Sequence, residues 1–216
     1  MRWREPLDAV RVVRRSLRDA WDALVAVAPI NLAWAGLGLT LVLLPPATAA
    51  LFESMSDLAV GRTPGIRDYF GAVRRRLVDG WAWALWGAAG LTVLAVNVRL
   101  YPDPADPRAW LSAAVAVLWV LFGVSVLYVW PLLLLQPGGG LLRAIRNSIF
   151  VTLGAPLFAI VLAMLLALVV AVGAVLILPL VLVLPGLICL VATHAVTDRL
   201  RAWGKLPPRA SAEAVD

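Results

Sequence analysis

The feature that most constrains this chain is a stretch of thirty residues, Ala23 to Phe52, that contains no charged side chain. A helix that crosses a bilayer needs about 20 apolar residues, so the stretch exceeds one crossing and falls short of two. Hydrophobic residues make up 62% of the sequence and charged residues 15%, whereas soluble domains have about 45–50% and about 25%. A chain of this size cannot cover so much apolar surface by itself. The sequence therefore predicts a membrane protein.

The predicted fold is all-α: a polytopic transmembrane bundle of five long spans, a short return helix that a proline initiates, and interfacial amphipathic helices. Pro45-Pro46 divides the first uncharged stretch, because proline disrupts a helix interior and tolerates only its first turn. We predict that the first span ends near Leu44 and that the return helix runs from Pro46 to Val60. The other spans are predicted at 81–98, at 109–136 and, twice, within 147–198, with a turn between residues 173 and 179.

Two segments read as amphipathic helices at the membrane surface. Residues 1–22 carry arginines between positions that recur at steps of three or four, namely Leu7, Val10, Val13 or Arg14, Leu17 and Trp21. Residues 62–79 carry five arginines beside a second apolar stripe. Such helices lie in the interface with basic side chains toward anionic headgroups. A solvated basic tail is the alternative for residues 1–22. We divide the chain into this N-terminal helix, a transmembrane domain at 23–200 and a polar tail at 201–216.

The distribution of arginine and lysine predicts the topology, because cytoplasmic loops are enriched in these residues. Residues 1–22 hold six, residues 62–79 five, residues 141–148 two and residues 199–216 four, which together are 17 of the 19 in the chain. We therefore predict a multi-pass protein of the cytoplasmic membrane with both termini inside. This arrangement requires the short helix at 46–60 to return the chain to the cytoplasm, and a five-span arrangement is the alternative. The net charge of +6 resides in these flanking segments, so we predict no nucleic-acid partner.

Motifs of enzyme active sites are missing from the sequence. It has no phosphate-binding loop, no nucleophile elbow and no HExxH or CxxC pattern. The single histidine, His194, precedes Asp198 by four residues and so shares a helix face with it. We interpret it as a histidine at the membrane boundary. With one cysteine and one histidine, a nitrogen- and sulfur-rich metal site is not expected. We predict a protein that is not an enzyme and that has no cofactor.

Polar residues in the first half suggest one candidate site. Glu53 and Asp57 lie four residues apart and therefore share one face of the short helix. Charged groups at membrane depth are costly and are commonly functional. Together with Asn31 and Thr48 they form a candidate polar cavity, open to the cytoplasm, for a cation or a polar ligand. The alternative is that both carboxylates lie in the headgroup layer and pair with arginines of residues 62–76.

The first half also carries a pattern of motifs: Asn31-Leu32-Ala33-Trp34, then residues 46–52 (PATAALF), then Gly61-Arg62 with Asp68-Tyr69-Phe70. This pattern resembles the YesL-like family of bacterial membrane proteins, known as domain of unknown function 624. The resemblance is best over residues 28–80. The chain differs from the family at residues 53–57, where apolar or aromatic residues are more usual.

The resemblance implies a bacterial inner-membrane protein associated with carbohydrate uptake. We therefore expect a non-enzymatic accessory or scaffold protein, with the lipid bilayer and a transporter permease as partners. A small transporter or channel with a polar cavity open to the cytoplasm is the alternative. The sequence does not identify a ligand or an oligomeric state.

Overall fold

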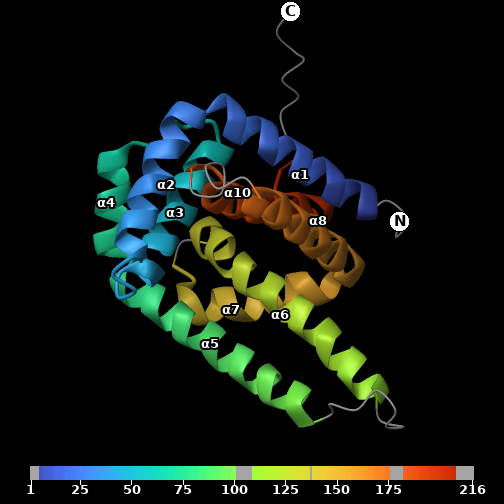
Figure 1. Cartoon of the computed structure of the whole chain (residues 1–216). Helices are drawn as coiled ribbons and strands as arrows, with labels where there is room; N and C mark the ends of the chain where they lie inside the picture. Colours follow the sequence, from blue (N-terminus) through green and yellow to red (C-terminus); the bar gives the residue numbers. More distant parts are fainter. Residues whose placement is uncertain (1–4, 101–108, 137, 176–181, 208–216) are drawn as a thin grey trace, which may run out of the picture.

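The computed structural model describes residues 5–100, 109–136, 138–175 and 182–207, and within these ranges it consists of α-helices and their connections (Figure 1). The helices are α1 (Glu5–Asp22), α2 (Leu24–Gly38), α3 (Leu44–Ala59), α4 (Ile66–Arg75), α5 (Leu77–Leu100), α6 (Ala109–Leu135), α7 (Gly140–Gly154), α8 (Pro156–Val175) and α10 (Leu184–Ala202). The all-α prediction is confirmed for these residues. Much of the C-terminal tail lies outside them.

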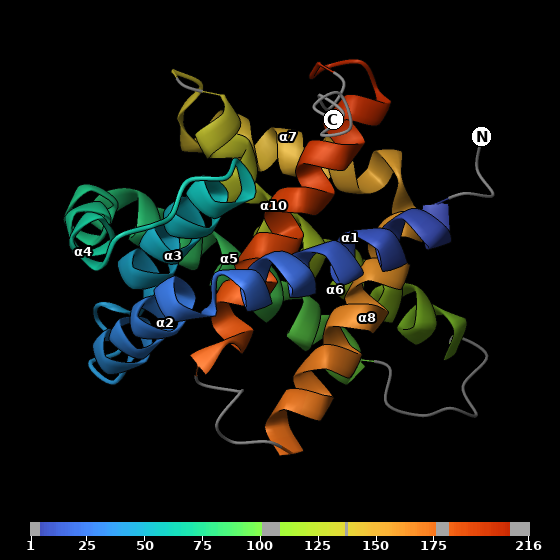
Figure 2. The same cartoon turned by 90° about the horizontal axis from the view of Figure 1, so that it is seen from above.

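Helix α1 lies across α8 and α10, and Figures 1 and 2 show it covering both. Its three sides differ. One side is buried and carries mostly small residues at steps of three or four, Ala9, Val12, Ser16 and Ala20. A second side is an exposed apolar stripe of Leu7, Val10, Leu17 and Trp21. A third side carries most of the charged residues. These three sides suit contact with the bundle, with lipid and with water respectively.

Helices α2 and α3 pack together as a hairpin. The first span was predicted to end near Leu44, which is wrong, because α2 ends at Gly38 and Leu44 begins α3. The Thr40 hydroxyl donates to the Leu37 carbonyl at 2.7 Å and accepts from the Leu43 amide at 3.2 Å. These contacts stabilise a turn in place of continued helix. Helix α3 then begins as expected, since its two prolines occupy positions that need no amide donor.

The other end of α3 agrees with its sequence. The helix ends at Ala59, and Gly61 has a φ of +83°, the left-handed conformation that commonly terminates helices. Helix α5 approaches the start of α3 closely, because a Cβ atom added at Gly80 would lie 2.8 Å from the Pro46 Cα atom. The core beneath this contact contains large buried side chains, among them Phe52, Tyr69 and Trp130.

The membrane-spanning helices are only partly as predicted. Two described segments are long and apolar enough to cross a membrane, Ala114–Leu135 in α6 and Pro156–Ala174 in α8. Helices α1 and α2 would add a third crossing if they formed one broken span, but they are bent by 94°. These features are those of a membrane protein, whereas five long spans are not confirmed. One reason is that α7 extends into the uncharged stretch after Arg146, and the chain breaks at Ala155 before α8 begins.

Candidate functional site

A pair of buried polar contacts attaches α1 to α10. The Arg199 guanidinium donates to the Asp8 carboxylate at 2.9 Å, and its side chain is only 8% exposed. The same guanidinium lies 4.1 Å from the centroid of the Phe158 ring on α8. Charged groups this far from water need such partners to offset the loss of hydration. The contacts therefore fix three helices at one junction.

The second contact is made by His194. Its Nδ1 atom lies 2.9 Å from the Ser16 Oγ atom, and its Nε2 atom lies 3.5 Å from the Asp19 carboxylate. His194 is 2% exposed and Ser16 is fully buried. The sequence had indicated a boundary histidine that shares a face with Asp198, and it did not anticipate these partners. The one feature of the sequence that could have indicated these partners is Ser16, a serine on the otherwise apolar buried side of α1.

Serine, histidine and aspartate are the residue types of a hydrolytic triad, but their arrangement here differs from one. The Ser16 hydroxyl donates to the Val12 carbonyl at 2.9 Å, so its proton is engaged within α1. Its oxygen is enclosed between helices, where a substrate carbonyl has no access. A catalytic serine needs a free approach for the reacting carbon and donors for the oxyanion. We interpret the contact as one that joins α1 to α10.

A charged cavity of about 430 Å³ opens beside His194, between the C-terminal halves of α3 and α10. We call it the charged cavity. Its polar lining consists of four arginines, two carboxylates, one histidine and three hydroxyls: Arg15, Arg62, Arg76, Arg201, Glu53, Asp57, His194, Ser56, Thr193 and Thr197. Helices that lie far apart in the sequence thus supply a single polar wall. Its volume is in the range of small-molecule sites.

Glu53 and Asp57 lie in this wall and also pair with arginines. Glu53 accepts hydrogen bonds from Arg75 at 2.7 Å and from Arg76 at 2.9 Å. Asp57 lies 3.4 Å from Arg62. The sequence left two interpretations of Glu53 and Asp57, a polar cavity and pairing with arginines of residues 62–76. Both carboxylates line a cavity and both have arginine partners, so the cavity and the pairing are compatible. The Glu53 contacts also hold the α4–α5 junction against α3.

Asn31 and Thr48, the other two residues of the candidate site, lie elsewhere. The Asn31 side-chain amide donates to the Leu182 carbonyl at 2.8 Å and is fully buried. Thr48 accepts a hydrogen bond from the Trp34 indole at 3.0 Å and lines a separate apolar cavity. The structure thus brings together two of the four residues. Thr48 lies on a different side of α3 from Glu53 and Asp57, which the polarity of the sequence alone could not indicate.

Two carboxyl groups next to the charged cavity have perturbed acidity. Burial, and then the neighbouring Asp22, raise the pKa of Asp19, while Arg18 opposes the rise. Burial also raises the pKa of Asp198, and Arg201 and Arg199 oppose it. Each group is the ion partner of an arginine that lines the cavity, Asp19 of Arg15 at 3.4 Å and Asp198 of Arg201 at 3.7 Å. Both carboxylates are therefore less stable in the ionised state than exposed ones.

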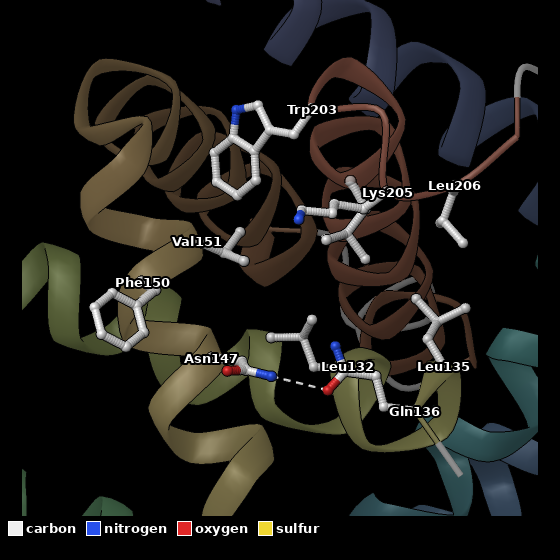
Figure 3. Close-up of a pocket in the computed structure, with 10 residues that line it drawn as sticks. Leu132, Leu135, Gln136, Asn147, Phe150, Val151, Trp203, Lys205 and Leu206 are labelled. Atoms are coloured by element: carbon white, nitrogen blue, oxygen red, sulfur yellow. Dashed lines mark hydrogen bonds between the residues drawn. The ribbon is translucent and has the colours of Figure 1, made fainter. Parts of the chain in front are cut away.

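A second cavity, of about 500 Å³, adjoins the first and shares Leu135 and Leu206 with it. Figure 3 shows Gln136 and Asn147 together on one side of this cavity, where the Asn147 amide donates a hydrogen bond of 2.8 Å to the Gln136 side-chain oxygen. Trp203 and Lys205 lie on its other side, and the remaining lining is apolar. Among the described residues that line it, Lys205 is the only charged one, so this cavity differs in character from the charged cavity. Within the described ranges, no group of three or more possible metal ligands lies together.

The comparisons with known proteins identify a family whose function is unknown. Residues 27–98 match the family model described as "Protein of unknown function, DUF624", which confirms the resemblance seen in the sequence. No curated protein and no solved structure is significantly similar to the chain. The matched segment contains α2, α3, α4 and most of α5. It therefore includes one wall of the charged cavity, while α1 and α10 supply the other.

Proposed function

We propose that this chain, whose residues 27–98 match the DUF624 family model, is a non-enzymatic accessory protein of the bacterial cytoplasmic membrane that serves carbohydrate uptake and binds a small polar ligand on its cytoplasmic side. The charged cavity is the observation that supports ligand binding, because charged groups gathered around an open volume are costly without an occupant or water. The buried position of Ser16 supports a role without catalysis. The link to carbohydrate uptake rests on the family resemblance.

The proposed topology has α1, α4, the charged cavity and both termini on the cytoplasmic side. The α2–α3 hairpin enters the bilayer from that side and returns to it. Helices α2 and α3 have 15 and 16 residues, or about 22–24 Å each at about 1.5 Å per residue, which is short of the ~30 Å hydrocarbon layer. The hairpin tip therefore lies within the hydrocarbon in this proposal.

The composition and hydrogen bonding of the tip support its position in lipid. Leu39, Leu41 and Val42 are exposed to the extent of 87%, 74% and 62%, and no charged residue is near them in the sequence. The amide groups of residues 39–44 donate to carbonyl oxygens nearby or to the Thr40 hydroxyl. The next two residues are prolines and have no amide proton. Because its amide donors already have partners, such a turn loses less hydrogen bonding in hydrocarbon than an open loop would.

Removal of the two cavity carboxylates tests the proposed role. In a strain that lacks the wild-type gene, the Glu53→Gln, Asp57→Asn double variant is expected to restore less than a tenth of the lost carbohydrate uptake. The physical reason is that both carboxylates are acceptors in the cavity wall. Asp57→Asn alone, which loses only one 3.4 Å contact, separates loss of function from loss of folding.

Uptake of labelled sugar is the measurement, with the amount of protein in the membrane determined in parallel. Asp22→Asn is the matched control, because Asp22 is 67% exposed, pairs only along its own helix and does not line the cavity. Full uptake by the double variant at normal abundance would contradict the proposed role of the cavity.

A small transporter is the second candidate function, and Asn31 is the residue that favours it. Its side-chain oxygen is buried without a hydrogen-bond partner among the described residues, between α2 and the start of α10. Transporters commonly have such polar groups at membrane depth. A Cβ atom at Gly186 would meet the Asn31 amide at 3.1 Å and the Met55 sulfur at 3.2 Å, so a transport path would have to open this packed region. Uptake by proteoliposomes that contain only this chain would favour the second candidate.

A further inference from the structure

Helix α7 carries two arginines, Arg143 and Arg146, and no acidic residue. The sequence contains no aspartate or glutamate between Asp106 and Asp198, so neither arginine has an acidic neighbour along the chain. Both side chains are exposed, and neither forms an ion pair or a hydrogen bond within the part of the chain that the structure describes. In α1, by contrast, four acidic residues balance four arginines, and three of those arginines form ion pairs within the helix.

The two arginines share one face of α7 with large apolar side chains. Positions three or four apart in a helix lie on one face, and the exposed positions of α7 follow this spacing. The exposed side chains, which we call the α7 face, are those of Leu142, Arg143, Arg146, Ile149, Phe150 and Leu153. Leu142 is 81% and Phe150 64% exposed, whereas the opposite side of the helix packs mainly against α6. An open groove of about 620 Å³ lies along this face, and both arginines line it.

Helix α7 joins the two described segments that are long and apolar enough to cross a membrane, which lie in α6 and α8. Its middle lies at the C-terminal end of α6, because Asn147 donates to the Gln136 side chain at 2.8 Å. Its end lies at the C-terminal end of α10, because a Cβ atom added at Gly154 would lie 2.9 Å from the Trp203 ring (Figure 2). The ends of α6 and α10 both line the charged cavity, which the proposed topology places on the cytoplasmic side. On that topology, the α7 face lies at the level of the inner-leaflet headgroups.

We propose that the α7 face binds an anionic phospholipid of the inner leaflet, with Arg143 and Arg146 as donors to its phosphate and the apolar residues of the face against its acyl chains. Arginine suits this role because its planar fork matches the oxygens of a phosphate group. Basic sites beside membrane-spanning helices on the cytoplasmic side bind anionic headgroups in this way. The site is separate from the charged cavity and depends on the proposed topology alone.

The combination of charge and apolar surface on the α7 face selects this occupant over two others. A soluble phosphate ester would neutralise the arginines but would leave Leu142 and Phe150 in water. A phosphatidylcholine molecule carries its own cation, so it would leave the positive charge of α7 uncompensated. An anionic phospholipid meets both requirements, because it brings net negative charge and apolar chains to the same face.

Native mass spectrometry of the full chain, released from detergent micelles, measures which lipid the protein retains. From equimolar phosphatidylglycerol and phosphatidylcholine, the wild type is expected to retain the anionic lipid at least fivefold more. The Arg143→Gln, Arg146→Gln double variant is expected to retain at least tenfold less phosphatidylglycerol, because each arginine beside an anionic headgroup favours binding about fivefold. The matched control is Arg11→Gln, Arg18→Gln, which removes the same charge from two exposed arginines of α1 that have aspartate partners. Because the effect of a charge falls off within a Debye length, the control is expected to retain phosphatidylglycerol within about twofold of the wild type.

Equal retention of the two lipids by the wild type would overturn the proposed site, and so would undiminished retention of phosphatidylglycerol by the α7 double variant. An equally large loss in the α1 control would overturn it as well, because it would show attraction by overall charge. Displacement of the lipid by glycerol phosphate would identify a soluble ligand, and a dimer that the α7 variant abolishes would assign the face to a second copy of the chain; either result would overturn the lipid site. Thermal unfolding verifies that each variant is folded, and the uptake assay of the carboxylate variants tests the proposed function independently.

Discussion

Replacement of Val42 by arginine is expected to lower the free energy of unfolding by about 2.5–3.5 kcal/mol, the cost of a charged side chain in the hydrocarbon region on insertion scales. Val42 is in the hairpin tip and is 62% exposed. In the proposed topology its exposed surface faces lipid, so a charge there has no water to solvate it. Reversible unfolding in lipid bicelles measures the effect.

Val60 provides the matched control at the opposite end of α3. It is the same residue type, it is 67% exposed, and it lines the charged cavity. Val60→Arg is expected to change the free energy of unfolding by no more than about 0.5 kcal/mol, as is usual for surface substitutions. Equal costs for the two variants would contradict a hairpin that has one end in lipid and the other in water.

Replacement of Arg199 by alanine is expected to lower the free energy of unfolding by about 2–4 kcal/mol. The variant leaves Asp8 without its partner at the α1–α10 junction and removes the guanidinium from the Phe158 ring. Removal of one partner from a buried pair is costly because the remaining charge is uncompensated. The figure is at the low end because the Asp8 side chain is 28% exposed and partly hydrated.

The control for this variant is Arg18→Ala, also at an ion pair with an aspartate. Arg18 is 83% exposed and its contact with Asp22 is 3.7 Å long, so a change within about 0.5 kcal/mol is expected. Chemical unfolding in detergent micelles compares the two variants. A loss of less than about 1 kcal/mol for Arg199→Ala would show that the junction does not hold α1 in place.

Local signals in the sequence predicted the parts of the fold that depend on neighbouring residues. The prolines and Gly61 correctly bounded α3, and the uncharged stretch at 109–136 closely matched α6. The end of α2 was missed because the Thr40 side chain closes the turn before the prolines. The five-span prediction is not confirmed for a similar reason, since Ala155 interrupts a stretch whose hydropathy is continuous.

The candidate site was harder to predict because it depends on tertiary contacts. Glu53 and Asp57 could be paired from their spacing, which places them on one helix face. Ser16 and His194 are separated by 178 positions, and nothing in the local pattern of either indicates the other. Arg15 likewise reaches the cavity only because α1 lies across α10. A search for polar residues within spans therefore found one wall of the cavity and missed the other.

The most direct test of a charged cavity that opens to the cytoplasm uses one cysteine in its wall. Thr197→Cys, in a Cys189→Ala background, introduces a thiol on the α10 side of the cavity. In membrane vesicles, small sulfonate and trimethylammonium thiosulfonate reagents are applied to one face at a time. The account predicts modification by both reagents from the cytoplasmic face only, because the cavity opens to that side. Modification by either reagent from the outer face would contradict it.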